Sequence, residues 1–122
     1  MEITHFILNV TSEDPDRLRA FYRDVVGLAP NPEMGPGAFV LMPGLTFAVG
    51  DHSSVQGQAR EPERVLIDFM VDDLKAEQAR LKAQGVQFIR EEGREEWGGV
   101  ISTFLDPDGN YCQLIEWRPE AP

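Results

Sequence analysis

The sequence contains one order of patterns twice, and this repeat constrains the fold more than any other feature. Each half begins with the alternating apolar pattern of a strand, continues with helical spacing, and ends with further short strands. The first half has a strand at 2–10, a helix at 11–27, an edge strand and loop at 28–37, and two strands within 39–50. The second half has a strand at 65–71, a helix at 72–85, and strands at 86–89, 100–105 and 110–117. The polar segment 51–63 between the halves has no period and is typical of a surface linker.

The repeat predicts a single domain, residues 1–122, built from two βαβββ modules at about 1–50 and 64–118. Both helices carry end signals: Ser12 or Asp14 precedes the first, Asp72 or Asp73 precedes the second, and Gly27 and Gly85 follow them. We therefore expect an α+β fold, in which two paired modules form a curved, cup-like mixed sheet with the helices on the outside.

The alternation within the strands divides their residues between two faces. The apolar residues expected to face the helices are Phe6, Leu8, Val10, Ile67, Phe69, Val71, Cys112 and Leu114. The residues expected on the concave face are His5, Ile7, Asn9, Leu66, Asp68, Met70, Tyr111, Gln113 and Ile115. A few polar groups among apolar ones are typical of a pocket for a small ligand. Asp68 stands out because a carboxylate in an apolar strand is costly to bury unless it is paired or hydrated.

Composition excludes several classes of function. The formal net charge of −10 argues against nucleic acid, which requires clusters of Lys and Arg, and it is compatible with a cationic small ligand. No apolar run approaches the ~20 residues of a membrane span, and we expect neither a signal peptide nor a membrane partner. With Cys112 as the single cysteine, no internal disulfide and no Cys-based zinc site is expected, which fits a reducing cytoplasm.

Two motifs at the strand ends carry a resemblance to a known family. The segment FYRDVVGL follows the first strand, and the turn DPDGN precedes the last strand in FLDPDGNYCQLIEW. Together with the repeated βαβββ order, they make the chain resemble the vicinal oxygen chelate superfamily, which includes glyoxalase I, extradiol dioxygenases, and bleomycin and fosfomycin resistance proteins. The resemblance covers nearly the whole chain and implies the fold, but the fold hosts many reactions.

The resemblance also implies where a metal would bind. Enzymes of this superfamily generally hold one divalent metal with ligands from the first and last strands of each half. His5 occupies the first such position, but the others fall on Leu66, on Gln113 in place of a glutamate, and on Phe47 or its neighbours Thr46 and Ala48. Such an ion needs about three protein ligands, mostly carboxylates or imidazoles. No metal or other cofactor is therefore expected, and His5 and Gln113 are the remaining candidate ligands.

Three functions follow from these residues. The first is a small-molecule-binding protein of the resistance type with a degenerate metal site. The second is a metal-dependent lyase, isomerase or dioxygenase of the glyoxalase kind, and the third is a metal-free enzyme with His5 and Asp68 as an acid/base pair. We favour the first, and the resemblance implies a homodimer. The candidate ligand-binding residues are His5, Asn9, Phe47, Leu66, Asp68, Met70, Tyr111 and Gln113. Trp97 is expected to anchor its loop.

Overall fold

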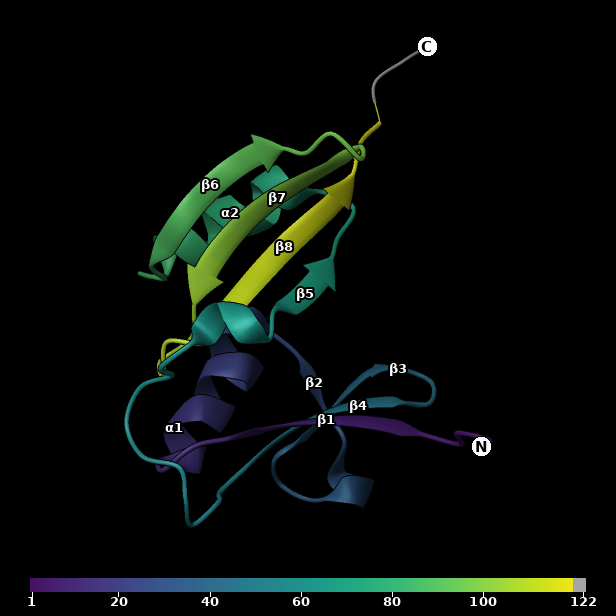
Figure 1. Ribbon diagram of the computed structural model, residues 1–122, viewed down its shortest axis with the longest axis vertical. Coiled ribbons are helices and arrows are strands. Elements are labelled where there is room, and N and C mark those ends of the chain that lie inside the picture. The colour runs from purple at the N-terminus through teal and green to yellow at the C-terminus, as the bar shows by residue number, and fades with distance from the viewer. Residues whose placement is uncertain (120–122) are drawn as a thin grey trace. The chain divides into compact units, whose positions relative to one another are not determined.

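The computed structural model describes residues 1–119, and the chain divides into two compact units, Met1–Gly57 and Gln58–Pro122 (Figure 1). Each unit contains one four-stranded mixed sheet and one α-helix. The order of elements is βαβββ in both units, which confirms the repeat and the α+β class. No helix among the described residues is long and apolar enough to cross a membrane.

The first unit contains all elements up to residue 50. They are β1 (Phe6–Thr11), α1 (Pro15–Ala20), the π-helical turn η1 (Phe21–Val26), β2 (Ala29–Pro30), the 3₁₀ turn η2 (Pro32–Met34), β3 (Ala38–Met42) and β4 (Leu45–Gly50). The sheet order is β1-β4-β3-β2, with β1 parallel to β4 and the other pairs antiparallel. The first strand begins at Phe6, not at residue 2 as the pattern predicts.

The signals at the ends of the first helix work as expected. Asp14 is the N-cap, its carboxylate accepts a hydrogen bond from the backbone N–H of Arg17, and Pro15 occupies the first turn. Gly27 ends the helical segment with φ +91°, a left-handed conformation that glycine adopts without a steric penalty. The last turn is π-helical, a local widening that the pattern does not predict.

The core of the first unit lies between α1, η1 and one face of the sheet. Leu18 and Tyr22 are fully buried there, together with Phe39 and Phe47 from β3 and β4. The ring of Tyr22 meets that of Phe47 edge-on, with centroids 4.7 Å apart and planes at 61°. Because aromatic rings bury large apolar areas, this cluster fixes which face of the sheet the helix covers.

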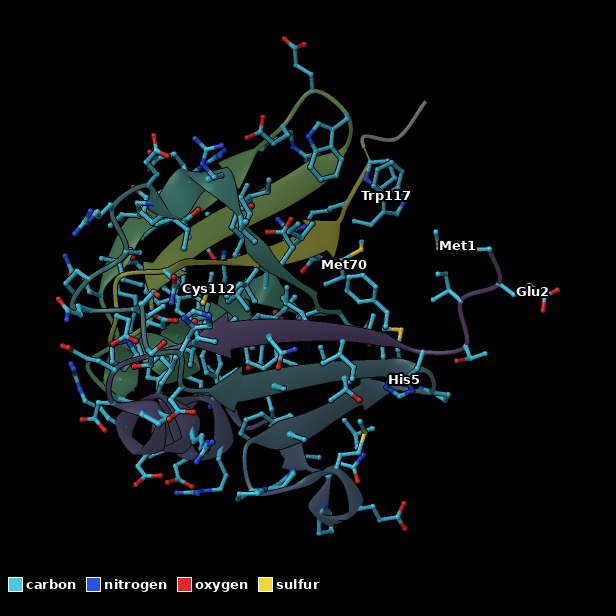
Figure 2. The ribbon with its side chains drawn as sticks, turned by 60° about the horizontal axis from the view of Figure 1, so that its bottom comes forward. Met1, Glu2, His5, Met70, Cys112 and Trp117 are labelled. Carbon is cyan, nitrogen blue, oxygen red and sulfur yellow. The ribbon has the colours of Figure 1, made fainter. Side chains whose placement is uncertain are left out.

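The second unit contains the remaining elements. They are η3 (Pro62–Arg64), β5 (Ile67–Met70), α2 (Leu74–Ala83), β6 (Phe88–Arg94), β7 (Gly99–Leu105) and β8 (Tyr111–Trp117). The sheet order is β5-β8-β7-β6, and β5 and β8 run parallel. The fold of this unit repeats that of the first: the helix covers one face, and Leu74, Leu81, Phe104, Cys112 and Leu114 are buried. Cys112, labelled in Figure 2, is fully buried, as expected for a residue on the apolar side of the sheet.

Strand β6 differs from the prediction, which ends it at residue 89 and assigns the next residues to a loop. The strand continues to Arg94 because it pairs with β7 along this length, with two shifts in register. Such bulges allow charged, locally loop-like sequence to stay in a ladder.

The DPDG turn is built around one carboxylate. Asp106 is buried and accepts hydrogen bonds from the backbone N–H groups of Asp108 and Asn110, both at 2.9 Å, and from the side-chain amide of Asn110 at 2.8 Å. Gly109 has φ +78°. The turn residues therefore connect β7 to β8 at a fixed register, as their types predict.

Candidate functional site

A row of polar side chains crosses the face of the second sheet that lies away from α2. Asp68 on β5 is the register partner of Gln113 on β8, and Gln113 is the partner of Thr103 on β7. Register partners in a sheet project to the same side. We call Asp68, Gln113 and Thr103 the polar row.

The register corrects the sequence analysis at one position. Leu66 occupies the implied metal-ligand position of the fifth strand, but the residue directly beside Gln113 is Asp68. Leu66 precedes β5 and is exposed. The difference arises because parallel register is set by the packing of two distant strands, which the local pattern of one strand does not specify.

The hydrogen bonds of the row leave acceptors free. The side-chain amide of Gln113 donates from Nε2 to Thr103 Oγ1 at 3.0 Å, and Thr103 is buried. Among residues 58–119, the Asp68 carboxylate has no hydrogen-bond or ion-pair partner. Partial loss of hydration raises the pKa of Asp68 above its usual value, because burial disfavours the charged form.

Apolar side chains flank the polar row. Met70 is 67% exposed, Leu66 is 43% exposed, and Ile115 is the register partner of Met70. Tyr111 begins β8 and is half-buried opposite Leu105. Four of the candidate residues, Leu66, Asp68, Met70 and Gln113, thus lie together on or beside two neighbouring strands, as a site for an organic ligand requires.

In the first unit, His5 lies just before β1 and bonds to β4 (Figure 2). Its Nε2 is 2.7 Å from Thr46 Oγ1, and the Thr46 hydroxyl donates in turn to the sulfur of Met34 at 3.4 Å. The Thr46 hydroxyl has one hydrogen, so while it donates to Met34 it can accept a hydrogen bond from His5 Nε2. A metal ion at Nε2 would have to break this contact.

Asn9 and Phe47 lie on opposite faces of the first sheet. Asn9 is exposed and is the register partner of Ala48, whereas Phe47 pairs with Leu8 and is fully buried against Tyr22. The expectation that Phe47 lines a ligand site is therefore wrong. The register places Thr46 and Ala48, its neighbours along the strand, on the face of Asn9.

Sequence reasoning missed an aromatic pair at the end of β8. The indoles of Trp97 and Trp117 stack with centroids 6.3 Å apart and planes at 16°, and both side chains are more than half exposed. A Cβ atom on Gly99 would lie 2.0 Å from the Trp97 ring, so only glycine there leaves room for that ring. Trp97 also lines a surface pocket of about 580 Å³; its lining residues are Arg94, Glu95, Glu96, Trp97, Gly98 and Pro119. The sequence could have indicated Trp117, because it continues the series of alternate residues Gln113 and Ile115 along the same strand.

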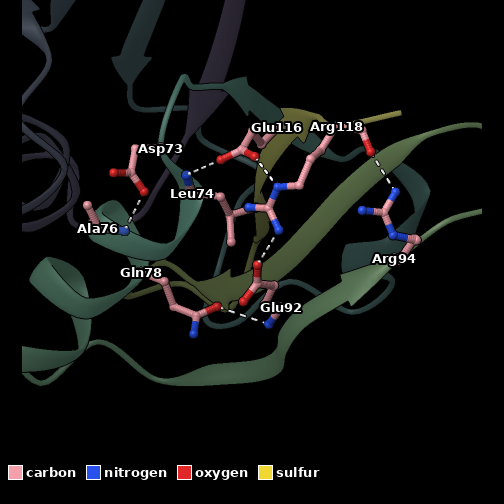
Figure 3. A network of polar contacts seen from close by, with 8 residues as sticks. All are labelled: Asp73, Leu74, Ala76, Gln78, Glu92, Arg94, Glu116 and Arg118. Atoms are coloured by element: carbon pink, nitrogen blue, oxygen red, sulfur yellow. Dashed lines mark hydrogen bonds and ion pairs between the residues drawn. The ribbon is translucent and has the colours of Figure 1, made fainter. Parts of the chain in front are cut away.

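A hydrogen-bond network fixes the residues on either side of Trp117 (Figure 3). Glu116 accepts from the backbone N–H of Leu74 at the start of α2, at 2.9 Å, and also pairs with Arg118. Arg118 bonds Glu92 on β6 at 2.8 Å, and its backbone carbonyl accepts from Arg94 at 2.5 Å. The Arg118 guanidinium and the Leu74 N–H lower the pKa of Glu116. The network ties the end of β8 to α2 and β6, and so holds Trp117 in place.

The side chains present do not fit the divalent metal site that the resemblance implies. Within residues 1–57 and within residues 58–119, no three His, Cys, Asp or Glu side chains lie close enough to share an ion. His5 is bonded through Nε2 to Thr46, and Gln113 brings a neutral amide that is bonded to Thr103. Beside Gln113 the polar row adds one carboxylate, Asp68, so the second unit offers one anionic and one neutral ligand. This is fewer than the about three protein ligands that such an ion needs.

Comparisons with known proteins agree with this architecture. Residues 2–114 match the family model of the Glyoxalase/Bleomycin resistance protein/Dioxygenase superfamily. The uncharacterized protein YetH of Bacillus subtilis is 28% identical over 109 residues, which cover 85% of this chain and 90% of YetH. A superfamily member from Sphaerobacter thermophilus has a similar crystal structure, with a TM-score of 0.72, 20% identity, and coverage of 95% of this chain and 98% of that one. The lactoylglutathione lyase of Agrobacterium tumefaciens gives a TM-score of 0.64 at 22% identity, covering 91% of each chain. The two structures show likeness of fold, whereas the family model shows membership: the chain belongs to the Glyoxalase/Bleomycin resistance protein/Dioxygenase superfamily.

Proposed function

We propose that this protein binds a small organic molecule at the polar row of the second unit and that binding needs no metal. The observation that carries the proposal is the Asp68 carboxylate, which has no partner among residues 58–119 and lies beside Gln113. The Asp68 side chain is exposed, so a ligand can reach its carboxylate, and the neighbouring amide of Gln113 offers a second polar group on the same face. The exposed apolar side chains of Leu66 and Met70 add the surface that an organic ligand would cover.

A metal-independent site follows from the donor chemistry. The last strand offers Gln113 where the resemblance implies a glutamate, and the start of β5 offers Leu66. A lyase activity of the kind named for the Agrobacterium structure is the alternative function. It would require an anionic ligand set, which these positions do not supply.

The proposal includes a homodimer in the cytoplasm. Large apolar side chains are exposed on β1 and β3 of the first unit, namely Phe6, Ile7, Val40 and Met42. The expectation that Phe6 packs under the helix is wrong, because its side chain at the start of β1 is 58% exposed. Exposed apolar surface of this kind favours association, and two-fold dimers are its commonest form. Light scattering coupled to size exclusion should give twice the 13.7 kDa mass of the chain. The single buried thiol of Cys112 suits a reducing compartment.

The test is a ligand screen followed by ¹H–¹⁵N correlation spectra of the labelled protein, with a strong chelator present throughout. The panel contains small aromatic cations, neutral amides and carboxylates. We expect at least one class to shift the backbone signals of Asp68, Met70, Thr103 and Gln113 while signals from α2 on the other face of the sheet, such as that of Lys75, stay fixed. Binding that disappears with the chelator and returns with a divalent ion would contradict the proposal, and so would the absence of any shift at the polar row.

A further inference from the structure

We infer that the polar row recognises a positively charged group with several N–H donors, such as an ammonium, amidinium or guanidinium, and that Asp68 supplies the counter-charge. The inference rests on the proposed function and names the chemistry of its ligand. Three observations support it. The polar row has more hydrogen-bond acceptors than donors, exposed apolar side chains flank it, and the nearby cation Arg90 is already paired with Glu95.

The row presents two adjacent acceptors without a donor between them. Strand β8 lies between β5 and β7, so Asp68 and Thr103 flank Gln113 on opposite sides. The Nε2 of Gln113 donates to Thr103, which leaves the amide oxygen as the free end of the side chain. The carboxylate of Asp68 can only accept when it is ionised. A ligand group with several N–H donors would satisfy both.

Among residues 58–119, no Lys or Arg side chain pairs with Asp68. Arg90 on β6 is the register partner of Thr103, but its guanidinium is engaged by Glu95, with Nη1 2.7 Å from Oε1. Asp68 is therefore a carboxylate whose charge no described residue of its unit compensates. The formal net charge of −10 adds a long-range attraction for cations.

The flanking residues favour an organic cation over an inorganic one. Leu66 and Met70, on either side of Asp68 along the chain, are both exposed and apolar. A hydrated metal ion gains nothing from such neighbours, whereas the hydrocarbon part of an amine or amidine does. A single carboxylate and a neutral amide are also too few ligands for a metal ion but match an amidinium, which donates to both.

The test compares benzamidine with its neutral isostere benzamide and with benzoate. Each is titrated into the labelled protein and followed at the backbone signals of Asp68, Thr103 and Gln113. Benzamidine should bind most tightly, and Asp68→Asn should weaken it by roughly three- to tenfold, the net range of a single hydrogen bond at a solvent-exposed site, while leaving benzamide unchanged. Asp68→Glu should restore part of the affinity, and Asp51→Asn, a change at an exposed linker carboxylate, should have no effect.

The outcomes separate the inference from the function on which it rests. If benzamide or benzoate shifts the same signals as strongly as benzamidine, and Asp68→Asn changes nothing, the site binds small molecules but the charge assignment is wrong. If none of the three probes shifts the polar row at millimolar concentration, both the inference and the proposed site fail. Dispersed spectra of the Asp68 variants confirm that any loss of affinity does not come from unfolding.

Discussion

Asp68 and Gln113 are register partners on the parallel strands β5 and β8, and their side chains share the sheet face that lies away from α2. The amide of Gln113 is held by Thr103, whereas the carboxylate of Asp68 has no partner among residues 58–119. The Asp68 side chain is exposed, but partial burial raises its pKa, so folding slightly disfavours its ionised form. Its presence is explained if it serves a ligand and not the fold, and four predictions about stability and structure accompany this view.

Replacing Asp68 by Asn should not destabilise the protein at neutral pH. The folded-state pKa of Asp68 is raised, so its ionised form is disfavoured by folding, and this penalty is fully present above the folded pKa. The penalty fades as the pH falls through the folded pKa and is absent below the unfolded pKa. Asp68→Asn should therefore unfold at equal or higher urea concentration at pH 7, with the difference vanishing in acid. A clear loss of stability at pH 7 would show that Asp68 has a structural partner.

Replacing Asp106 by Ala should destabilise the protein by about 1–3 kcal/mol, because the buried N–H of Asp108 loses its acceptor. Asp106→Asn keeps one acceptor oxygen and should have a smaller effect. Urea unfolding measures both. Equal stability of Asp106→Ala and the native chain would mean that this carboxylate does not hold the turn.

Replacing Gly99 by Ala should separate the stacked indoles. The new Cβ would lie 2.0 Å from the Trp97 ring, which must then leave its place beside Trp117. The near-ultraviolet circular dichroism of the pair should change, as it should in Trp97→Phe. Gly50→Ala is the matched control, since no atom lies within 4 Å of its added Cβ. A native spectrum for Gly99→Ala would contradict the stacking.

Replacing Glu116 by Gln should lower the melting temperature at neutral pH. The pKa of Glu116 is depressed by the Arg118 hydrogen bond and by the Leu74 N–H, so its contribution is present above the unfolded pKa and is lost as the pH falls through the folded pKa. The difference in melting temperature between variant and native protein should therefore begin to shrink near the ordinary Glu pKa of about 4.3 and vanish once the pH lies below the lowered pKa of Glu116. Glu63→Gln, a change at an exposed residue, should have the melting temperature of the native protein at both neutral and acidic pH. If the melting temperature of Glu116→Gln stays below that of the native protein in acid, the loss of stability comes from packing and not from the charge of Glu116.

Local signals predicted much of this fold. The alternation placed Ile67, Cys112 and Leu114 toward the helix, and Asp14 and Gly27 marked the ends of the first helical segment. These features depend on neighbours in sequence, so the sequence alone can specify them.

The errors occurred where distant strands meet. The partner of Gln113 and the inward direction of Phe47 depend on strand register, which is set by packing between segments far apart in the chain. The pairing of β3 with β4 also shifts register between Val40 and Met42, an irregularity that the alternation of one strand does not specify. The stacking of Trp117 was missed because its partner, Trp97, lies in the connection between β6 and β7, 20 residues earlier in the chain.

The central claim is that the protein binds its ligand without a divalent metal, and metal analysis of protein purified without chelator tests it most directly. Elemental analysis is run on the native chain and on His5→Ala, together with a Gln113→Glu variant that supplies the missing carboxylate. We predict less than one equivalent of divalent metal in the native chain and in His5→Ala. Any increase in bound metal should occur in Gln113→Glu. One equivalent of a divalent ion in the native protein, lost in His5→Ala, would contradict the account.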